Sequence, residues 1–341
     1  MALSSPAHEA LMATQLPFLP QLSVVIPTCR RPDLLERCIH ALLAQEGIHG
    51  ELEIVVVDDA RTPACKDVVR GYTLPLMSVR LRCIHPPAGA CGPAAARNAG
   101  WRAAHGAIIA FTDDDTLPDP HWLAEGLRAL TPGTGAVWGR VVVPMPEHPT
   151  DAERNTGGLH DAEFITANCF VRRDVMRRVG GFDERFKRPW REDSDLYFTL
   201  LDAGIRVLPA PAAVVVHPVR DAPPGNSIRQ HRNLIFDALL YKKHPRLYRQ
   251  KISAGPPLHY YLVVLAGLML LAGLLTDTPG LCVAGALVWL ALSARLAVRR
   301  LRGVSHHWLN VSDIVASSLI IPFVAVFWRL AGAWRYRVPF A

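Results

Sequence analysis

Apolar runs alternate with segments of helical periodicity through the first part of the chain. The runs 22–27, 52–57 and 107–112 are almost continuously apolar, and a weaker strand pattern lies at 79–84. Between them, 32–43 and 93–104 carry apolar residues at helical spacing, and Pro32 and Pro93 stand at favourable first positions. Strands that are apolar on both faces and alternate with helices predict a mostly parallel sheet covered by helices on both sides, an α/β fold of Rossmann-like type.

The pattern continues less regularly to about residue 225. It predicts a strand at 136–143, a loop rich in Pro, Gly and Asn at 144–159, helices beginning near Arg173 and near Asp193, and a strand at 213–216. The stretch 221–226 reads as a linker. We therefore expect a flexible tail at 1–20 and an α/β domain at 21–225.

The remaining residues, 226–341, have the pattern of a membrane-associated segment. An uncharged stretch at 258–275 would be about 27 Å long as a helix, enough to cross a bilayer core. A second span is expected at about 279–298. Basic clusters flank the pair on one side, which predicts a hairpin whose turn lies outside the cell. A buried core hairpin is the alternative. An interfacial amphipathic helix is expected at about 312–335. A third membrane span there would place three arginines on the outer side of the membrane, against the positive-inside rule.

Composition supports this division. The chain is 50% hydrophobic and carries a net charge of +7, with its basic excess beside the apolar spans. Anionic lipid headgroups explain that excess better than nucleic acid, which we do not expect as a partner. The seven scattered cysteines suggest reduced thiols, and no signal-peptide pattern is present. The domain at 21–225 is therefore expected to face the cytoplasm, in a protein integral to the cytoplasmic membrane.

The strongest chemical signal is the run Thr112-Asp113-Asp114-Asp115, which follows a predicted strand. Adjacent carboxylates repel one another unless a cation lies among them. Asp113 and Asp115 can share one face of the strand end and hold Mg²⁺ or Mn²⁺, leaving positions for diphosphate oxygens. The alternative is a solvated acidic turn. An EF-hand is excluded, since its glycine and terminal glutamate are missing.

A second acidic group, Arg191 to Asp195, opens a predicted helix, and His217 follows a predicted strand. Acids in a first turn are also ordinary helix caps, and a histidine at a strand end is often a surface residue. Taken with the aspartate run, they form a set of oxygen and nitrogen ligands and a candidate base, as metal-assisted group transfer requires.

Six motifs in order make residues 21–220 resemble family 2 glycosyltransferases with the GT-A fold. They are IPTCRRPDLLERCIHALLAQ, VVVDDA, GPAAARNAGW, IIAFTDDDTLPDPHW, ITANCFVRRDVMRRVGGFDERF and REDSDLYFTLLDAG. The resemblance implies transfer of a sugar from a nucleoside-diphosphate sugar. Cys29 and Arg30 differ from the usual IPTYNR, and Ala60 and Arg61 from the usual DDGS. A UDP-sugar is the first expectation, with GDP- and dTDP-sugars left open.

The resemblance also implies roles for individual residues. Those on the donor side are Pro27, Thr28, Asp58 and Asp59 for the nucleoside, Arg97 beside the nucleotide, Asp113 and Asp115 on the metal and diphosphate, and Asp114 within the same run. Asp193, the acid of the ED motif, would be the catalytic base, and His217 would complete the metal shell. Asn168, Trp190 and Glu192 are expected on the acceptor side.

The acceptor is expected to be a lipid-linked or cell-envelope glycan, because a tethered enzyme meets substrates that diffuse in the bilayer. Two alternatives stay open. One is a processive polysaccharide synthase, although the usual QxxRW-type motif is replaced by RQHRNLIF. The other is an inactive membrane-anchored scaffold that binds a nucleotide sugar. Retention of three mutually repelling acids argues against an inactive site.

Overall fold

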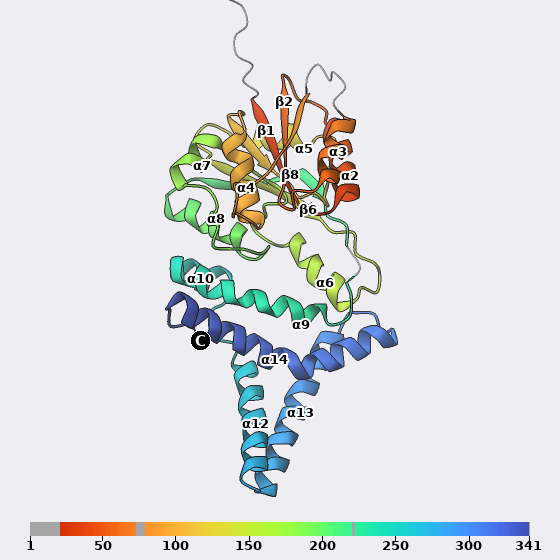
Figure 1. Cartoon of the computed structure of the whole chain (residues 1–341), viewed down its shortest axis with the longest axis vertical. Coiled ribbons are helices and arrows are strands. Elements are labelled where there is room, and N and C mark those ends of the chain that lie inside the picture. Colours follow the sequence, from red (N-terminus) through yellow and green to blue (C-terminus); the bar gives the residue numbers. More distant parts are fainter. Residues whose placement is uncertain (1–20, 73–78, 220–221, 341) are drawn as a thin grey trace, which may run out of the picture.

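The computed structural model describes residues 21–72, 79–219 and 222–340 (Figure 1). The predicted tail at 1–20 lies outside these residues. One eight-stranded sheet forms the upper domain, in the order β3-β2-β1-β4-β7-β6-β8-β5. Its strands are β1 (Leu22–Thr28), β2 (Leu52–Asp58), β3 (Val79–Ile84), β4 (Ile108–Phe111), β5 (Leu117–Pro118), β6 (Ala136–Val142), β7 (Cys169–Arg172) and β8 (Val207–Val216).

The first half of the sheet is parallel, as the apolar pattern predicts. β3, β2, β1 and β4 pair in parallel, with Thr28 of β1 in register with Asp58 of β2. Successive side chains of a strand point to opposite faces. Val25 accordingly belongs to one core, with α4 (Pro93–Ala103), α7 (Arg173–Val179) and α8 (Glu192–Asp202), while Val24 and Ile26 belong to the other, with α2 (Pro32–Leu43), α3 (Pro63–Gly71) and α5 (Trp122–Ala129).

The second half of the sheet is mixed. β7 runs antiparallel to both β4 and β6, whereas β6 and β8 are parallel. The predicted loop at 144–159 contains a helix, α6 (Asp151–Gly157), so that prediction was wrong over its second half. Its start is a capping box in which Thr150 and Glu153 satisfy each other's backbone N–H groups. This S/T-x-x-E pattern is a helix signal readable in the sequence.

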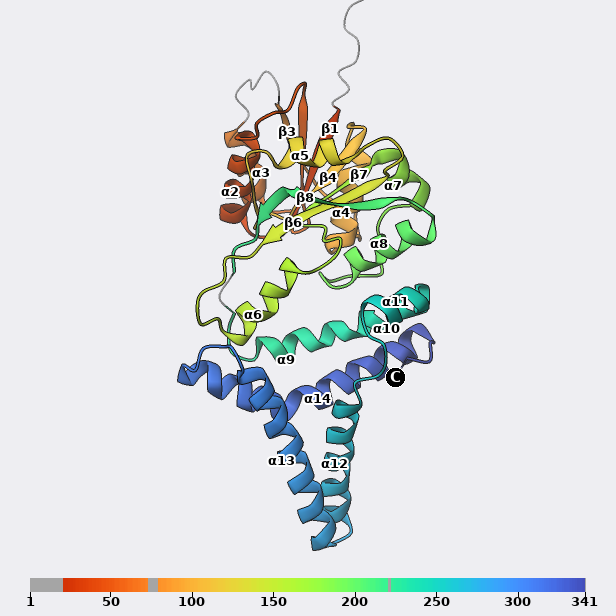
Figure 2. The ribbon, with the colours of Figure 1, turned by 180° about the vertical axis from the view of Figure 1, so that it is seen from behind.

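The C-terminal helices, α9 to α14, complete the molecule. Three short helices lie beneath the sheet domain: α9 (Asn226–His231), α10 (Ile235–Lys243) and α11 (Pro245–Lys251). Below them α12 (Leu258–Leu275) and α13 (Pro279–Leu301) form a projecting hairpin, and α14 (Trp308–Tyr336) crosses between that hairpin and α9 and α10 (Figures 1 and 2). α12 has the bounds predicted for the first span, and α13 continues beyond residue 298, where the second was expected to end.

The surface of these helices is apolar. Apart from Met145, every exposed large hydrophobic side chain of the described residues lies in α12, α13 or α14. All three helices are long and apolar enough to cross a membrane by length and composition. A protein surface of this kind needs lipid or another apolar partner. The helices could therefore anchor the protein in a membrane.

Candidate active site

A cavity of about 1,380 Å³ opens at the carboxyl ends of the parallel strands and extends down to α9 and α11. Parallel α/β sheets bind ligands at this edge because several strand ends converge there. Most of the residues predicted for the site line the cavity: Pro27, Thr28, Asp59, Arg97, Asp113, Asp115, Trp190, Glu192, Asp193 and His217. Asp58, Asp114 and Asn168 do not.

Arg97 joins the two acidic motifs. It lies on α4, is only 4% exposed, and donates to Asp113 at 2.7 Å and to Glu192 at 3.0 Å. A buried guanidinium requires such partners, since an unpaired charge in the interior is costly. Burial favours the neutral form of Arg97, but the two carboxylates outweigh it and raise the pKa. The end of β4 and the start of α8 are thus held at one wall of the cavity.

Asp193 is the next residue of this wall. Its carboxylate accepts the backbone N–H of Ser194 at 2.6 Å. Burial raises the pKa of Asp193, opposed by that hydrogen bond and by the positive charges of Arg97 and Arg191. Burial also raises the pKa of Glu192, and the negative charge of Asp193 adds to the effect. A carboxylate with a raised pKa is a stronger proton acceptor, which a general base requires.

Two of the three predicted metal ligands come together. Nε2 of His217 lies 3.7 Å from Oδ1 of Asp115. The other ring nitrogen, Nδ1, lies 3.2 Å from the carbonyl oxygen of Pro218, which can only accept. A neutral ring that donates from Nδ1 to this carbonyl presents Nε2 as its metal-binding nitrogen. Asp113 instead pairs with Arg97.

No closed metal centre forms in the part of the chain that the structure describes, where no three His, Cys, Asp or Glu side chains gather as ligands. Mg²⁺ and Mn²⁺ at phosphate sites need only one or two protein ligands, because substrate oxygens and water supply the rest. Asp115 and His217 fit that open arrangement, since the carboxylate of Asp115 is a donor that suits both ions and imidazole is a common metal ligand.

Asp114 points away from the cavity and is fully buried. Its carboxylate accepts from Thr28 at 2.6 Å and pairs with Arg31 at 2.6 Å. Burial raises the pKa of Asp114 to about 6, although Arg31 and Thr28 oppose the change. Asp114 therefore supports the strand ends, and we do not retain it as a nucleotide contact.

Arg31 lines the cavity, and the residue-by-residue prediction missed it. Its guanidinium contacts both Asp114 and Asp115, at 2.6 and 3.4 Å. A cation beside an acidic strand end can neutralise phosphate oxygens as well as carboxylates. The available signal was its position between the end of β1 and Pro32, in the IPTCRR segment.

Asp58 and Asn168 are also held inside the structure. Asp58 accepts backbone N–H groups of Ala60 and Thr62 at 3.0 and 2.6 Å, which fixes the turn that presents Asp59 to the cavity. The Asn168 amide bonds Trp122 at 2.8 Å and the backbone of β6 and β8. Because all of its polar atoms are used within the sheet, we do not retain Asn168 on the acceptor side.

The start of α8 is braced by α10. Asp237 of α10 is 3% exposed and accepts from Trp190 at 2.7 Å, Arg191 at 2.9 Å and Tyr248 at 3.0 Å. Arg191 precedes α8 with φ of 73°, a left-handed conformation that is strained for a residue with a side chain. The contact with Asp237 stabilises this turn directly before Glu192 and Asp193.

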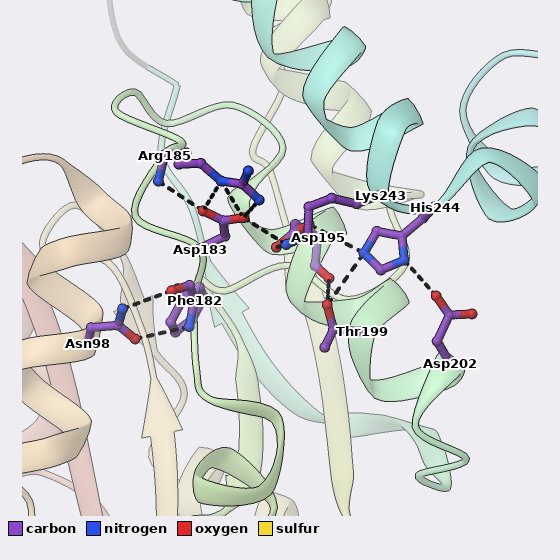
Figure 3. A network of polar contacts seen from close by, with 9 residues as sticks. All are labelled: Asn98, Phe182, Asp183, Arg185, Asp195, Thr199, Asp202, Lys243 and His244. Atoms are coloured by element: carbon purple, nitrogen blue, oxygen red, sulfur yellow. Dashed lines mark hydrogen bonds and ion pairs between the residues drawn. The ribbon is translucent and has the colours of Figure 1, made fainter. Parts of the chain in front are cut away.

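A second contact lies further along α8 (Figure 3). Asp195 pairs with Lys243 at 2.7 Å and lies 3.3 Å from Nε2 of His244, whose Nδ1 is 2.6 Å from Asp202. Burial would lower the pKa of His244, but these two carboxylates outweigh it and raise the pKa. α8, the helix that carries the candidate base, is therefore joined to α10 and the adjoining His244 at two points.

Sequence comparison places the chain among known enzymes. The model of Glycosyl transferase family 2 matches residues 23–182, and that of Glycosyl transferase family group 2 matches residues 108–301. Glycosyltransferase AglE of Haloferax volcanii is 30% identical over 222 residues, which cover 61% of this chain and 69% of AglE. Validoxylamine A glucosyltransferase of Streptomyces hygroscopicus subsp. limoneus is also 30% identical, over 58% of this chain and 52% of its own length.

A more extended match is the pre-mycofactocin glycosyltransferase of Mycobacterium tuberculosis, 27% identical over 87% of this chain and 62% of its own. Among solved structures, mannosyltransferase PcManGT from Pyrobaculum calidifontis, in complex with GDP-Man and Mn²⁺, superposes with a TM-score of 0.57 at 20% identity. The match covers 94% of this chain and 88% of that one, and at this identity it shows a shared fold. The chain belongs to glycosyltransferase family 2, and its sheet domain has the GT-A fold.

Proposed function

We propose that the chain transfers a sugar from a nucleoside-diphosphate sugar to a hydroxyl of a lipid-linked or other cell-envelope glycan, with inversion at the anomeric carbon. One observation carries the proposal: acidic side chains from the ends of two distant segments meet around Arg97 at a single cavity that also reaches the membrane-associated helices. That cavity has room for both a nucleotide sugar and an acceptor.

The donor would lie along the strand ends. Pro27, Thr28 and Asp59 line the end expected to hold the nucleoside. One oxygen of Asp59 accepts from Gly92 at 3.0 Å, while the other has no hydrogen-bond partner within the described chain and can accept from a ligand hydroxyl. A divalent cation on Asp115 and His217 would neutralise charge on the departing diphosphate. Arg31 and Arg97 add fixed positive charge on the same side.

Asp193 would act as the base. Its carboxylate would take the proton of the acceptor hydroxyl while the oxygen attacks the anomeric carbon and the bond to the diphosphate breaks. Glu192, held by Arg97, and Trp190 would position the acceptor. One displacement of this kind inverts the configuration at carbon and releases a nucleoside diphosphate.

The membrane side of the proposal is a cytoplasmic catalytic domain held on the bilayer by the α12–α13 hairpin, with α14 lying in the interface. The crosswise course of α14 beneath α9 and α10 supports this, as do the arginines at the base of the hairpin. O-antigen and succinoglycan biosynthesis proteins among the relatives agree with an envelope glycan as acceptor.

The test is a screen of UDP-, GDP- and dTDP-sugars against the full chain, measured first as a metal-dependent thermal shift and then as nucleotide release and transfer. A matching donor should stabilise the protein by mass action and be turned over. Binding without turnover on any acceptor would favour the inactive scaffold. Long polymeric products would favour the processive synthase.

A further inference from the structure

A second cavity, of about 380 Å³, lies at the base of the hairpin. Its walls come from α6, α9 and each of the three long apolar helices. Tyr260 lies in the first turn of α12, and Arg300 lies in the last turn of α13. If the hairpin spans the bilayer, these turns are at the level of the lipid headgroups, where phosphate groups of lipids are found.

The cavity carries net positive charge. Arg154 and Arg300 both contact Asp151, at 3.1 and 2.7 Å, so two guanidinium groups share one carboxylate. The Ser227 hydroxyl is buried at the cavity and has no hydrogen-bond partner within the described chain. Burial lowers the pKa of His231, which favours its neutral form. An oxyanion would match the surplus cation and satisfy the hydroxyl.

This cavity adjoins the active-site cavity. Ala152, Asn155, Gly158, Asn226 and Gln230 line both cavities. A ligand bound at the hairpin base would therefore lie next to the larger cavity, which Asp193 also lines. Ile321 of α14 and Tyr260 supply an apolar side toward the membrane.

We propose that the smaller cavity binds the phosphate of a polyisoprenyl-linked acceptor, with the hydrocarbon chain leaving toward the bilayer and the acceptor hydroxyl entering the active site. The inference rests on the proposed function, and it narrows the acceptor to an isoprenoid that carries phosphate. Arg154 and Ser227 would contact the phosphate oxygens. Arg300 is also fixed by Ser317 and Ser318, at 2.8 and 3.0 Å, so it braces the site as well.

The test uses the full chain in phosphatidylcholine nanodiscs and farnesyl phosphate as the probe, with binding measured by fluorescence titration. Farnesyl phosphate should bind at least about tenfold more tightly than farnesol or inorganic phosphate, because only it carries both features. Arg154→Gln should weaken its binding by about tenfold, since a charge-assisted contact is lost. Ser227→Ala is a second test variant, and it should weaken binding by a smaller factor than Arg154→Gln.

Arg229→Gln is the matched control. Arg229 is on α9, donates to the carbonyl groups of Pro223 and Pro224, and lines neither of the two cavities, so binding should stay as in the wild type. Unchanged binding in both Arg154→Gln and Ser227→Ala would overturn the proposal, as would equal competition by phosphatidylglycerol, which would show a general anionic-lipid site. Donor binding is measured on the same samples. Its absence in the wild type would refute the proposed function, while the lipid result would still show whether the smaller cavity binds farnesyl phosphate.

Discussion

Arg97 makes the candidate base and the aspartate run parts of one site. Arg97 forms ion pairs with Asp113 and Glu192. The neighbouring Asp193 carboxylate accepts a backbone hydrogen bond from Ser194. The same buried surroundings raise the pKa of Asp193. These two facts support the proposal that Asp193 accepts the proton, and they lead to the first prediction.

Asp193→Asn should leave donor binding intact and lower the turnover number by about 10²- to 10⁴-fold, because the amide cannot accept the acceptor's proton. Steady-state kinetics and a donor thermal shift measure the two effects separately. Asp174→Asn is the matched control: this carboxylate also accepts the N–H of the next residue, at 2.9 Å, but lies outside the cavity. Turnover close to the wild-type value in Asp193→Asn would refute its role as base.

Metal removal tests the pair formed by Asp115 and His217. EDTA should abolish transfer, because the diphosphate leaving group loses the cation that neutralises its charge. Added Mn²⁺ or Mg²⁺ should restore transfer. His217→Ala should raise the metal concentration needed for half-maximal activity by about tenfold or more. His121→Ala, an exposed histidine outside the cavity, should leave that concentration unchanged. Transfer that continues in EDTA would exclude the metal role.

Among the helices, α10 does more than connect the sheet domain to the hairpin. Through Asp237 it holds Trp190 and the strained Arg191, immediately before the catalytic motif. Asp237→Asn should lower the turnover number by about tenfold, because the turn before α8 loses its charged anchor and misplaces Asp193. The Michaelis constant for the donor should change little.

A purely structural role for Asp237 would lower the thermal midpoint without changing turnover at temperatures well below it. Kinetics at low temperature alongside a melting curve therefore separate the two roles. Asp313→Asn is a suitable comparison, since Asp313 accepts from the backbone of Gly225 at 2.6 Å and is outside the active-site cavity.

The contact between α8 and α10 should also make stability depend on pH. The pKa of His244 is raised in the folded state. The contribution of its ionic contacts to folding stability is therefore fully present below the pKa of the unfolded state, near 6.5, and is lost as pH rises through the folded-state pKa. His244→Gln should thus lower the melting temperature on the order of 2 °C below pH 6.5 and have a smaller effect in alkaline buffer. His148→Gln, an exposed position, should show no such trend. An equal loss at every pH would contradict the ionic role.

Elements with strong internal patterns were predictable, and elements made by distant partners were not. β1 and α12 could be predicted from their residues alone, because each is apolar along most of its length. β7 is short and lies antiparallel between β4 and β6, which depends on contacts across the sheet. At the site, most of the residues named from the motif resemblance line the cavity. The resemblance missed Arg31 and the contacts of Asp237 with Trp190 and Arg191. It also predicted an acceptor-side role for Asn168, whose side-chain amide is used in hydrogen bonds within the fold.

For the whole molecule, the arrangement of the helices places the active site just above the proposed membrane surface. The core that contains Val25 of β1 also contains Leu239 of α10, Tyr248 of α11 and Phe340 at the C-terminal end, so the sheet domain and the membrane-associated helices share packing. A hinge between them would expose this surface, which is unfavourable. The position of the catalytic cavity relative to the bilayer should therefore be fixed by the hairpin.

That geometry predicts which residues face each side of the membrane. In a Cys29→Ser, Cys91→Ser background, Thr276→Cys at the hairpin turn should react with an impermeant maleimide added to intact spheroplasts. Arg335→Cys near the end of α14 should react only after permeabilisation, because an interfacial α14 returns the chain to the catalytic side. A control protein that keeps Cys91, an exposed cysteine of the sheet domain, shows the labelling expected on the catalytic side. If Arg335→Cys instead labels with Thr276→Cys, α14 crosses the bilayer, and the smaller cavity would no longer lie at the headgroup level on which the acceptor proposal depends.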